Sequence, residues 1–150
     1  MFLSIREVEP MEIIFDDNLI TGNATIDSQH KELIDRIAEF VRVCENGEGK
    51  VKAIKMLDYL DEYTNFHFSA EEDLQKEVNY PDYPAHHNKH EEFKKTIQTL
   101  YDYLDEYEGP NEKFVQMVQD KVVDWLFTHI KSADRSVAEF IYMVENPNRL

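Results

Sequence analysis

The sequence predicts an all-α protein, an up-down-up-down antiparallel four-helix bundle with an N-terminal arm. Only 4 glycines and 5 prolines occur in 150 residues, which favours long helices over many short strands. Four segments carry apolar residues at helical spacing, and the short connections between them imply antiparallel neighbours. We expect an arm over residues 1–22, in which Ile13, Ile14 and Phe15 pack over the bundle, and a single bundle domain over residues 23–150.

The first two predicted helices cover residues 24–44 and residues 50–78. Asn23 is the expected cap of the first helix, because its side-chain oxygen can accept from an orphan amide of the first turn. The second helix has one inward stripe whose members are three or four residues apart. They are Ile54, Leu57, Leu60, Thr64, His67, Glu71 and Leu74.

The third and fourth predicted helices cover residues 85–107 and residues 111–144. In the fourth, the apolar stripe runs regularly as far as His129. The next coherent stripe begins at Asp134, one residue out of step, and continues through Val137 and Ile141. Because one inserted residue in a helix is commonly accommodated by a π turn at a functional site, we expect such a turn between His129 and Asp134.

Composition excludes several classes of partner. The formal charge is −15, from 31 acidic against 16 basic residues, and such a surface repels nucleic acid and anionic membranes. The absence of a long apolar run predicts no membrane span, and residues 1–10 do not resemble a secretory signal. Cys44 is the single cysteine, which excludes an internal disulfide and suits the cytoplasm. We expect it to be a buried, inert thiol.

Polar side chains that bind metals gather on the inward stripes. Five of the six histidines point inward, namely His30, His67, His86, His90 and His129, and His87 alone points elsewhere. Glu71 and Asp134 point inward as well. Burying these groups without partners is costly, and a metal removes that cost. One inward histidine is more often a hydrogen-bonded core residue than a ligand, so the prediction depends on the joint pattern.

The number and type of donors restrict the metal. Seven protein ligands are too many for one tetrahedral zinc, which takes about four. Calcium and magnesium prefer shells made of oxygen, whereas five of these donors are imidazoles. A pair of first-row ions bridged by the two carboxylates accounts for every donor. The set suits iron, and manganese, cobalt or zinc could occupy it in vitro.

Four motifs resemble the hemerythrin family and occur in that family's order between about residues 15 and 134. They are Ile26-Asp27-Ser28-Gln29-His30; His67-Phe68-Ser69-Ala70-Glu71-Glu72; Tyr80-Pro81 with His86 and His90; and Trp125-Leu126-Phe127-Thr128-His129 followed by Asp134. The resemblance implies the same bundle and a centre of two iron ions with an oxo or hydroxo bridge. It also implies that dioxygen binds this centre reversibly.

The resemblance assigns a role to each donor. His86, His90 and His129 would hold one iron, and His30 and His67 would hold the other, which keeps an open position for dioxygen. Glu71 and Asp134 would bridge the pair. The oxygen pocket would be lined by Phe68, Trp125, Leu126 and Ile130, which are also compatible with plain core packing. Partners of the metal-bound imidazoles are expected among Gln29, Glu72 and Asp27.

The chain departs from the family in its arm. Bacterial relatives commonly carry tryptophan where Phe15 stands and Val-Gly where Thr21-Gly22 stands, so the arm is expected to seal the bundle differently. We expect a binding protein rather than an enzyme, since no inward residue besides the ligands resembles a proton donor. The alternatives are a di-iron enzyme acting on peroxide or nitric oxide, an iron storage or repair protein, an oxygen sensor with a separate protein partner, and a metal-free bundle.

Overall fold

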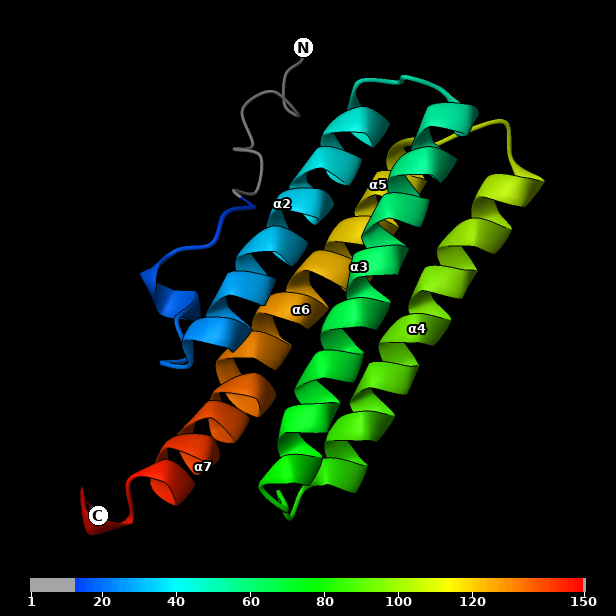
Figure 1. Ribbon diagram of the computed structural model, residues 1–150. Coiled ribbons are helices and arrows are strands. Elements are labelled where there is room, and N and C mark those ends of the chain that lie inside the picture. Colours follow the sequence, from blue (N-terminus) through cyan, green and yellow to red (C-terminus); the bar gives the residue numbers. More distant parts are fainter. Residues whose placement is uncertain (1–12, 150) are drawn as a thin grey trace.

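The computed structural model describes residues 13–149 and contains helices and no strand within that range. Three long helices and one composite helix form the bundle. They run alternately up and down (Figure 1). The first three are α2 (Ala24–Glu45), α3 (Lys50–Glu77) and α4 (Tyr83–Glu106). The predicted four-helix bundle is therefore confirmed. No helix in the described part of the chain is long and apolar enough to span a membrane.

The fourth helix is continuous but is interrupted twice by π-helical turns. It consists of α5 (Glu112–Val118), the π segment η2 (Gln119–Val123), α6 (Asp124–His129), the π segment η3 (Ile130–Asp134) and α7 (Arg135–Glu145). The segment η3 confirms the π turn predicted between His129 and Asp134. The segment η2 is a second π turn, which the sequence analysis did not predict.

The helix ends follow local chemistry. The side chain of Asn23 accepts a hydrogen bond from the amide of Ile26 at 3.0 Å, as expected for the cap of α2. Asn111 caps α5 in the same way, with a distance of 2.8 Å to the amide of Phe114. Helix α4 begins at Tyr83, two residues earlier than predicted, because Pro84 lies in the first turn, where a missing amide costs nothing.

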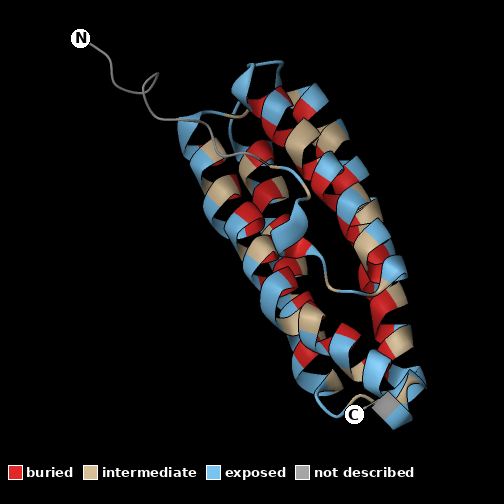
Figure 2. Cartoon of the chain, turned by 90° about the vertical axis from the view of Figure 1, so that its left-hand side faces the viewer, coloured by how far each residue is buried: buried red, intermediate tan, exposed pale blue. Residues whose placement is uncertain are grey.

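The apolar core forms two clusters, and buried residues line the inner faces along the bundle (Figure 2). The larger cluster includes Leu33, Ile37 and Phe40 of α2, and the smaller one includes Ile26 and Val137. Along α2, His30 comes after Ile26 of the smaller cluster and before Leu33 of the larger one. It therefore lies between the two clusters. Cys44 is buried, and burial raises the pKa of its thiol to about 12, which agrees with an inert thiol.

The inward stripe of α3 differs from the prediction at one position. Gln75 is fully buried, whereas Leu74, the residue predicted there, is half-buried. The regular helix places position 75 directly one turn beyond Glu71, and Leu74 instead packs on the side of the smaller apolar cluster. A polar carboxamide thus takes the place of the expected leucine.

The described part of the arm packs on the bundle. Ile13 and Phe15 contact the larger core cluster, and Leu19 in the 3₁₀ turn η1 (Asp17–Leu19) is buried within it. Ile14 is an exception to the prediction, since 52% of its surface is exposed. Arg135 at the start of α7 donates hydrogen bonds to the arm's backbone carbonyls. Residues 1–12 of the predicted arm lie outside the described residues.

Candidate metal centre

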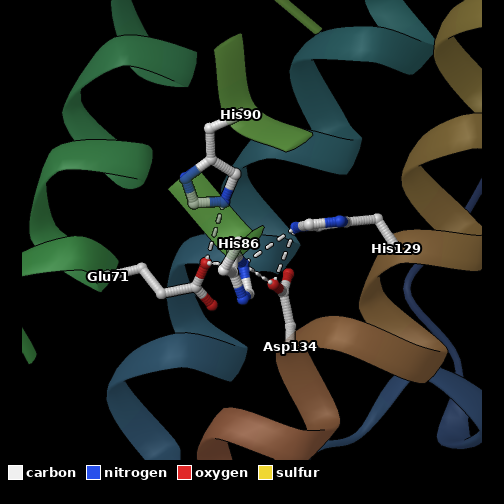
Figure 3. Close-up of side chains that lie close together, drawn as sticks. All are labelled: Glu71, His86, His90, His129 and Asp134. Atoms are coloured by element: carbon white, nitrogen blue, oxygen red, sulfur yellow. Dashed lines mark hydrogen bonds and ion pairs between the residues drawn. The ribbon is translucent and has the colours of Figure 1, made fainter. Parts of the chain in front are cut away.

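The seven polar residues predicted to point inward are brought together from all four helices of the bundle. Each is at most 4% exposed. They form two overlapping groups. Within each group, the ligand atoms all lie within 4.8 Å of one another. One group contains Glu71, His86, His90, His129 and Asp134, and Figure 3 shows these side chains converging; the other contains His30, His67, Glu71 and Asp134. Both groups share the same two carboxylates.

The distances show nitrogen and oxygen atoms facing a common point. The Nε2 atom of His86 lies 3.0 Å from Oε1 of Glu71 and 2.9 Å from Oδ1 of Asp134. The Nε2 atom of His129 lies 2.9 Å from the same Asp134 oxygen, and the Nε2 atom of His30 lies 2.8 Å from its other oxygen, Oδ2. The carboxylate of Asp134 is therefore shared between the two groups of histidines.

Several of these atoms have no hydrogen-bond partner, and their arrangement shows whether the residues fit a metal. The Nε2 atoms of His30, His67 and His90 are buried without a hydrogen-bond partner, as are both carboxylate oxygens of Glu71 and Asp134. His30 is close to Asp134 but is not aligned with it as a donor. Buried unpaired polar atoms are costly, and here they all present lone pairs to one region. Imidazole and carboxylate donors in this arrangement fit transition-metal ions.

The pKa shifts within the cluster show how strongly its groups interact. Burial is the main reason that the pKa of His67 falls to about 4. Burial also opposes the charged form of His86, but its close contacts with the carboxylates of Asp134 and Glu71 outweigh this effect and raise the pKa of His86 to about 9. Although burial would raise the pKa of Asp134, the neighbouring imidazole of His129 holds it well below its usual value. A metal ion would replace the protons that these carboxylates draw to the imidazoles.

Residues around the cluster orient the imidazoles through their other ring nitrogens. The Nδ1 atom of His67 donates to Oε1 of Gln29 at 2.8 Å, and that of His90 donates to Oε2 of Glu72 at 2.7 Å. Two of the three expected partners are thus placed beside a histidine. Asp27 is not, because its carboxylate accepts from Thr21 and Gly22 and ties the arm to the start of α2.

Comparison with known proteins shows the family to which this chain belongs. The model of the family described as Hemerythrin HHE cation binding domain matches residues 21–141. The chain belongs to the hemerythrin family. A bacteriohemerythrin of Stenotrophomonas maltophilia is 28% identical over 127 residues, which are 85% of this chain and 80% of the relative. A bacteriohemerythrin of Clostridium acetobutylicum is 29% identical over 125 residues, which are 81% of this chain and 95% of the relative.

Solved structures agree with this assignment. The crystal structure of a wild-type hemerythrin matches with a TM-score of 0.69 at 26% identity, covering 81% of this chain and 90% of that chain. A crystal structure of a point mutant matches with the same TM-score of 0.69 at 25% identity, covering 81% of this chain and 89% of that chain. The chain is thus a hemerythrin-family domain with a histidine and carboxylate cluster able to hold metal.

Two of the four apolar residues expected to line an oxygen pocket, Phe68 and Trp125, stack on histidines of this hemerythrin-type cluster. The ring of Phe68 stacks on His90 with centroids 3.8 Å apart and an interplanar angle of 3°. Trp125 stacks on His129 with centroids 4.5 Å apart. Leu126 and Ile130 are fully buried in the larger core cluster. The two stacked rings fix the orientation of the histidines and keep apolar surface against the cluster.

Two residues near the cluster were missed or left aside by the sequence analysis. Gln75 is buried one turn beyond Glu71, and neither polar atom of its carboxamide has a hydrogen-bond partner. Its spacing of four residues from Glu71 and eight from His67 was the signal that could have placed it inward. His87 was set aside because it points away from the cluster, yet its ring contacts Glu72. No pattern along one helix shows that contact, because it joins α3 to α4.

Proposed function

We propose that this protein holds a pair of non-haem iron ions and binds dioxygen reversibly. The observation that carries the proposal is the pair of overlapping ligand groups that share Glu71 and Asp134. Two ions that share two carboxylates lie close enough to act on one small molecule together. The similarity to bacteriohemerythrins supports iron as the metal.

The proposed assignment follows the two groups. His86, His90 and His129 would complete the shell of one ion, and His30 and His67 would hold the other with a position open to dioxygen. When bound, reduced iron would supply the electrons for reversible dioxygen binding. The chain's own contribution would be an apolar wall of Phe68, Leu126 and Ile130, which are buried, and Trp125, which is partly buried. Such a wall excludes water and so slows side reactions.

The visible spectrum tests this function directly. The protein is loaded with ferrous iron without air, exposed to oxygen and then purged with inert gas. We expect absorption bands that appear with oxygen and vanish on purging over repeated cycles. Zinc-loaded protein is the control, because zinc occupies similar donors but has no redox chemistry. Prompt oxidation that purging does not reverse would contradict the proposal and favour an enzyme acting on peroxide or nitric oxide.

A further inference from the structure

A chain of hydrogen bonds connects the proposed metal centre to the surface of the protein. His87, with 40% of its side chain exposed, places Nδ1 2.8 Å from Oε1 of Glu72. The other carboxylate oxygen of Glu72 lies 2.7 Å from Nδ1 of the fully buried His90. An ionised carboxylate only accepts hydrogen bonds, so both imidazoles donate to it. Glu72 therefore receives one donor from the surface and one from the cluster.

The ring of His90 is held in place by Phe68 on one face and by Glu72 at its Nδ1 atom. Phe68 stacks against one face of its ring at 3.8 Å, nearly parallel. His87 and His90 are three residues apart on α4, so their rings lie on one side of that helix. The hydroxyl of Tyr83 also donates to Oε1 of Glu72, at 3.3 Å, on the same oxygen as His87. The carboxylate is thus held between two donors on the outer side and one on the inner side.

Competition between these donors has a chemical consequence. A metal-bound imidazole becomes a stronger ligand when its other N–H donates to a carboxylate. Each further donor to the same carboxylate draws negative charge away and weakens that effect. We propose that His87 is a positioning residue of the metal centre, which sets through Glu72 how strongly His90 donates electrons to the metal. This inference rests on the proposed ligand role of His90, but not on dioxygen binding.

Removing the outer donor should strengthen the inner hydrogen bond. In His87→Leu, Glu72 would attract the Nδ1 proton of His90 more strongly, and His90 would become a better donor to an oxidised ion. The reduction potential of the iron-loaded protein should then shift to more negative values. Oxidation in air should accelerate roughly threefold, the change expected from part of one hydrogen bond. In His87→Gln, whose amide can still donate, both quantities should stay near those of the unmodified protein.

The deciding experiment uses zinc-loaded protein and proton and nitrogen magnetic resonance. Zinc is diamagnetic and redox-inactive, so the Nδ1 proton of His90 can be observed whether or not the protein binds dioxygen. We expect this resonance to move downfield in His87→Leu and to return in His87→Gln. The matched control is Asn88→Leu, an exposed substitution at the adjacent position, which should leave the resonance in place.

Two results would overturn the inference. One is a His90 resonance that stays in place in His87→Leu, which would show that the outer donor has no influence on the ligand. The other is an equal displacement in His87→Leu and Asn88→Leu, which would indicate a general effect of surface substitutions on α4. A failure of reversible oxygen binding alone would contradict the proposed function and leave this measurement valid.

Discussion

At the scale of single residues, Glu71 is one of the two residues common to both ligand groups of the proposed centre. Its carboxylate belongs to both ligand groups, is fully buried, and has no hydrogen-bond partner on either oxygen. Burial lowers the pKa of His86, but contacts with Asp134 and Glu71 raise it to about 9, so these two carboxylates favour the protonated form of His86. Loss of either carboxylate should therefore affect both ions and not one alone.

Replacement of Glu71 by alanine tests this shared role. We expect the iron content to fall from about two ions per chain to less than one, because both ligand groups lose an oxygen donor. Metal analysis after gel filtration measures the change, and Glu92→Ala, at an exposed position on α4, is the matched control. A Glu71→Ala protein that retains both ions with an unchanged spectrum would show that the bridging assignment is wrong.

The sequence was informative about individual residues where helical phase alone decides their position. His30, His67, Glu71 and the other cluster residues point inward because the regular step of a helix sends them there. Sequence could not select Gln29 and Glu72 over Asp27, since those contacts depend on rotamers and on the packing of neighbouring helices. Gln75 was missed because the stripe was continued through the apolar Leu74, although both positions fit a step of three or four.

At the scale of elements, the fourth helix contains two π turns. The sequence predicted η3 but not η2, and the residues in each turn explain the difference. The segment η3 begins directly after His129 and ends at Asp134, and the spacing of these two residues does not fit a regular stripe. In η2, Val122 fits the regular stripe, while Val123 beside it is also buried. Adjacent apolar residues hide a change of register, because either can be read as the inward one.

Deletion of one residue from a π turn should restore a regular helix and change only the distances across that turn. In a Ser132 deletion, the groups on either side of η3 approach by about 1.5 Å. His129 directly precedes that turn and Asp134 is its last residue, and ligand distances tolerate only about 0.2 Å. We expect helix content by circular dichroism to be preserved and metal affinity to fall at least about tenfold.

A deletion in the other π turn provides the control for that prediction. Removal of Asp120, an exposed residue of η2, shortens the helix before His129 and so leaves the spacing between His129 and Asp134 intact. Its metal affinity should stay close to that of the full chain. Equal affinity in both deletion proteins would show that η3 is not required to set the geometry of the cluster.

At the scale of the whole molecule, the cost of the buried cluster is distributed over all four helices. Helices α2, α3 and α4 and the composite helix each contribute at least one of its residues. In the metal-free protein the carboxylates and imidazoles satisfy one another only partly. A metal ion held between the helices offsets that cost and links the helices to one another, so stability and metal loading should be coupled.

Removal of the metal should therefore lower the melting temperature of the whole bundle. At a metal concentration 1,000 times the dissociation constant, binding to the folded state contributes about 4 kcal/mol, which corresponds to about 10 °C for a chain of this size. Differential scanning calorimetry with and without a chelator measures the shift, and added zinc or ferrous iron should restore it. The net charge of −15 also destabilises the fold, but salt screens surface repulsion and hardly affects a buried cluster. The shift should thus persist at high salt, whereas a shift abolished by salt would place the metal on the acidic surface instead of between the helices.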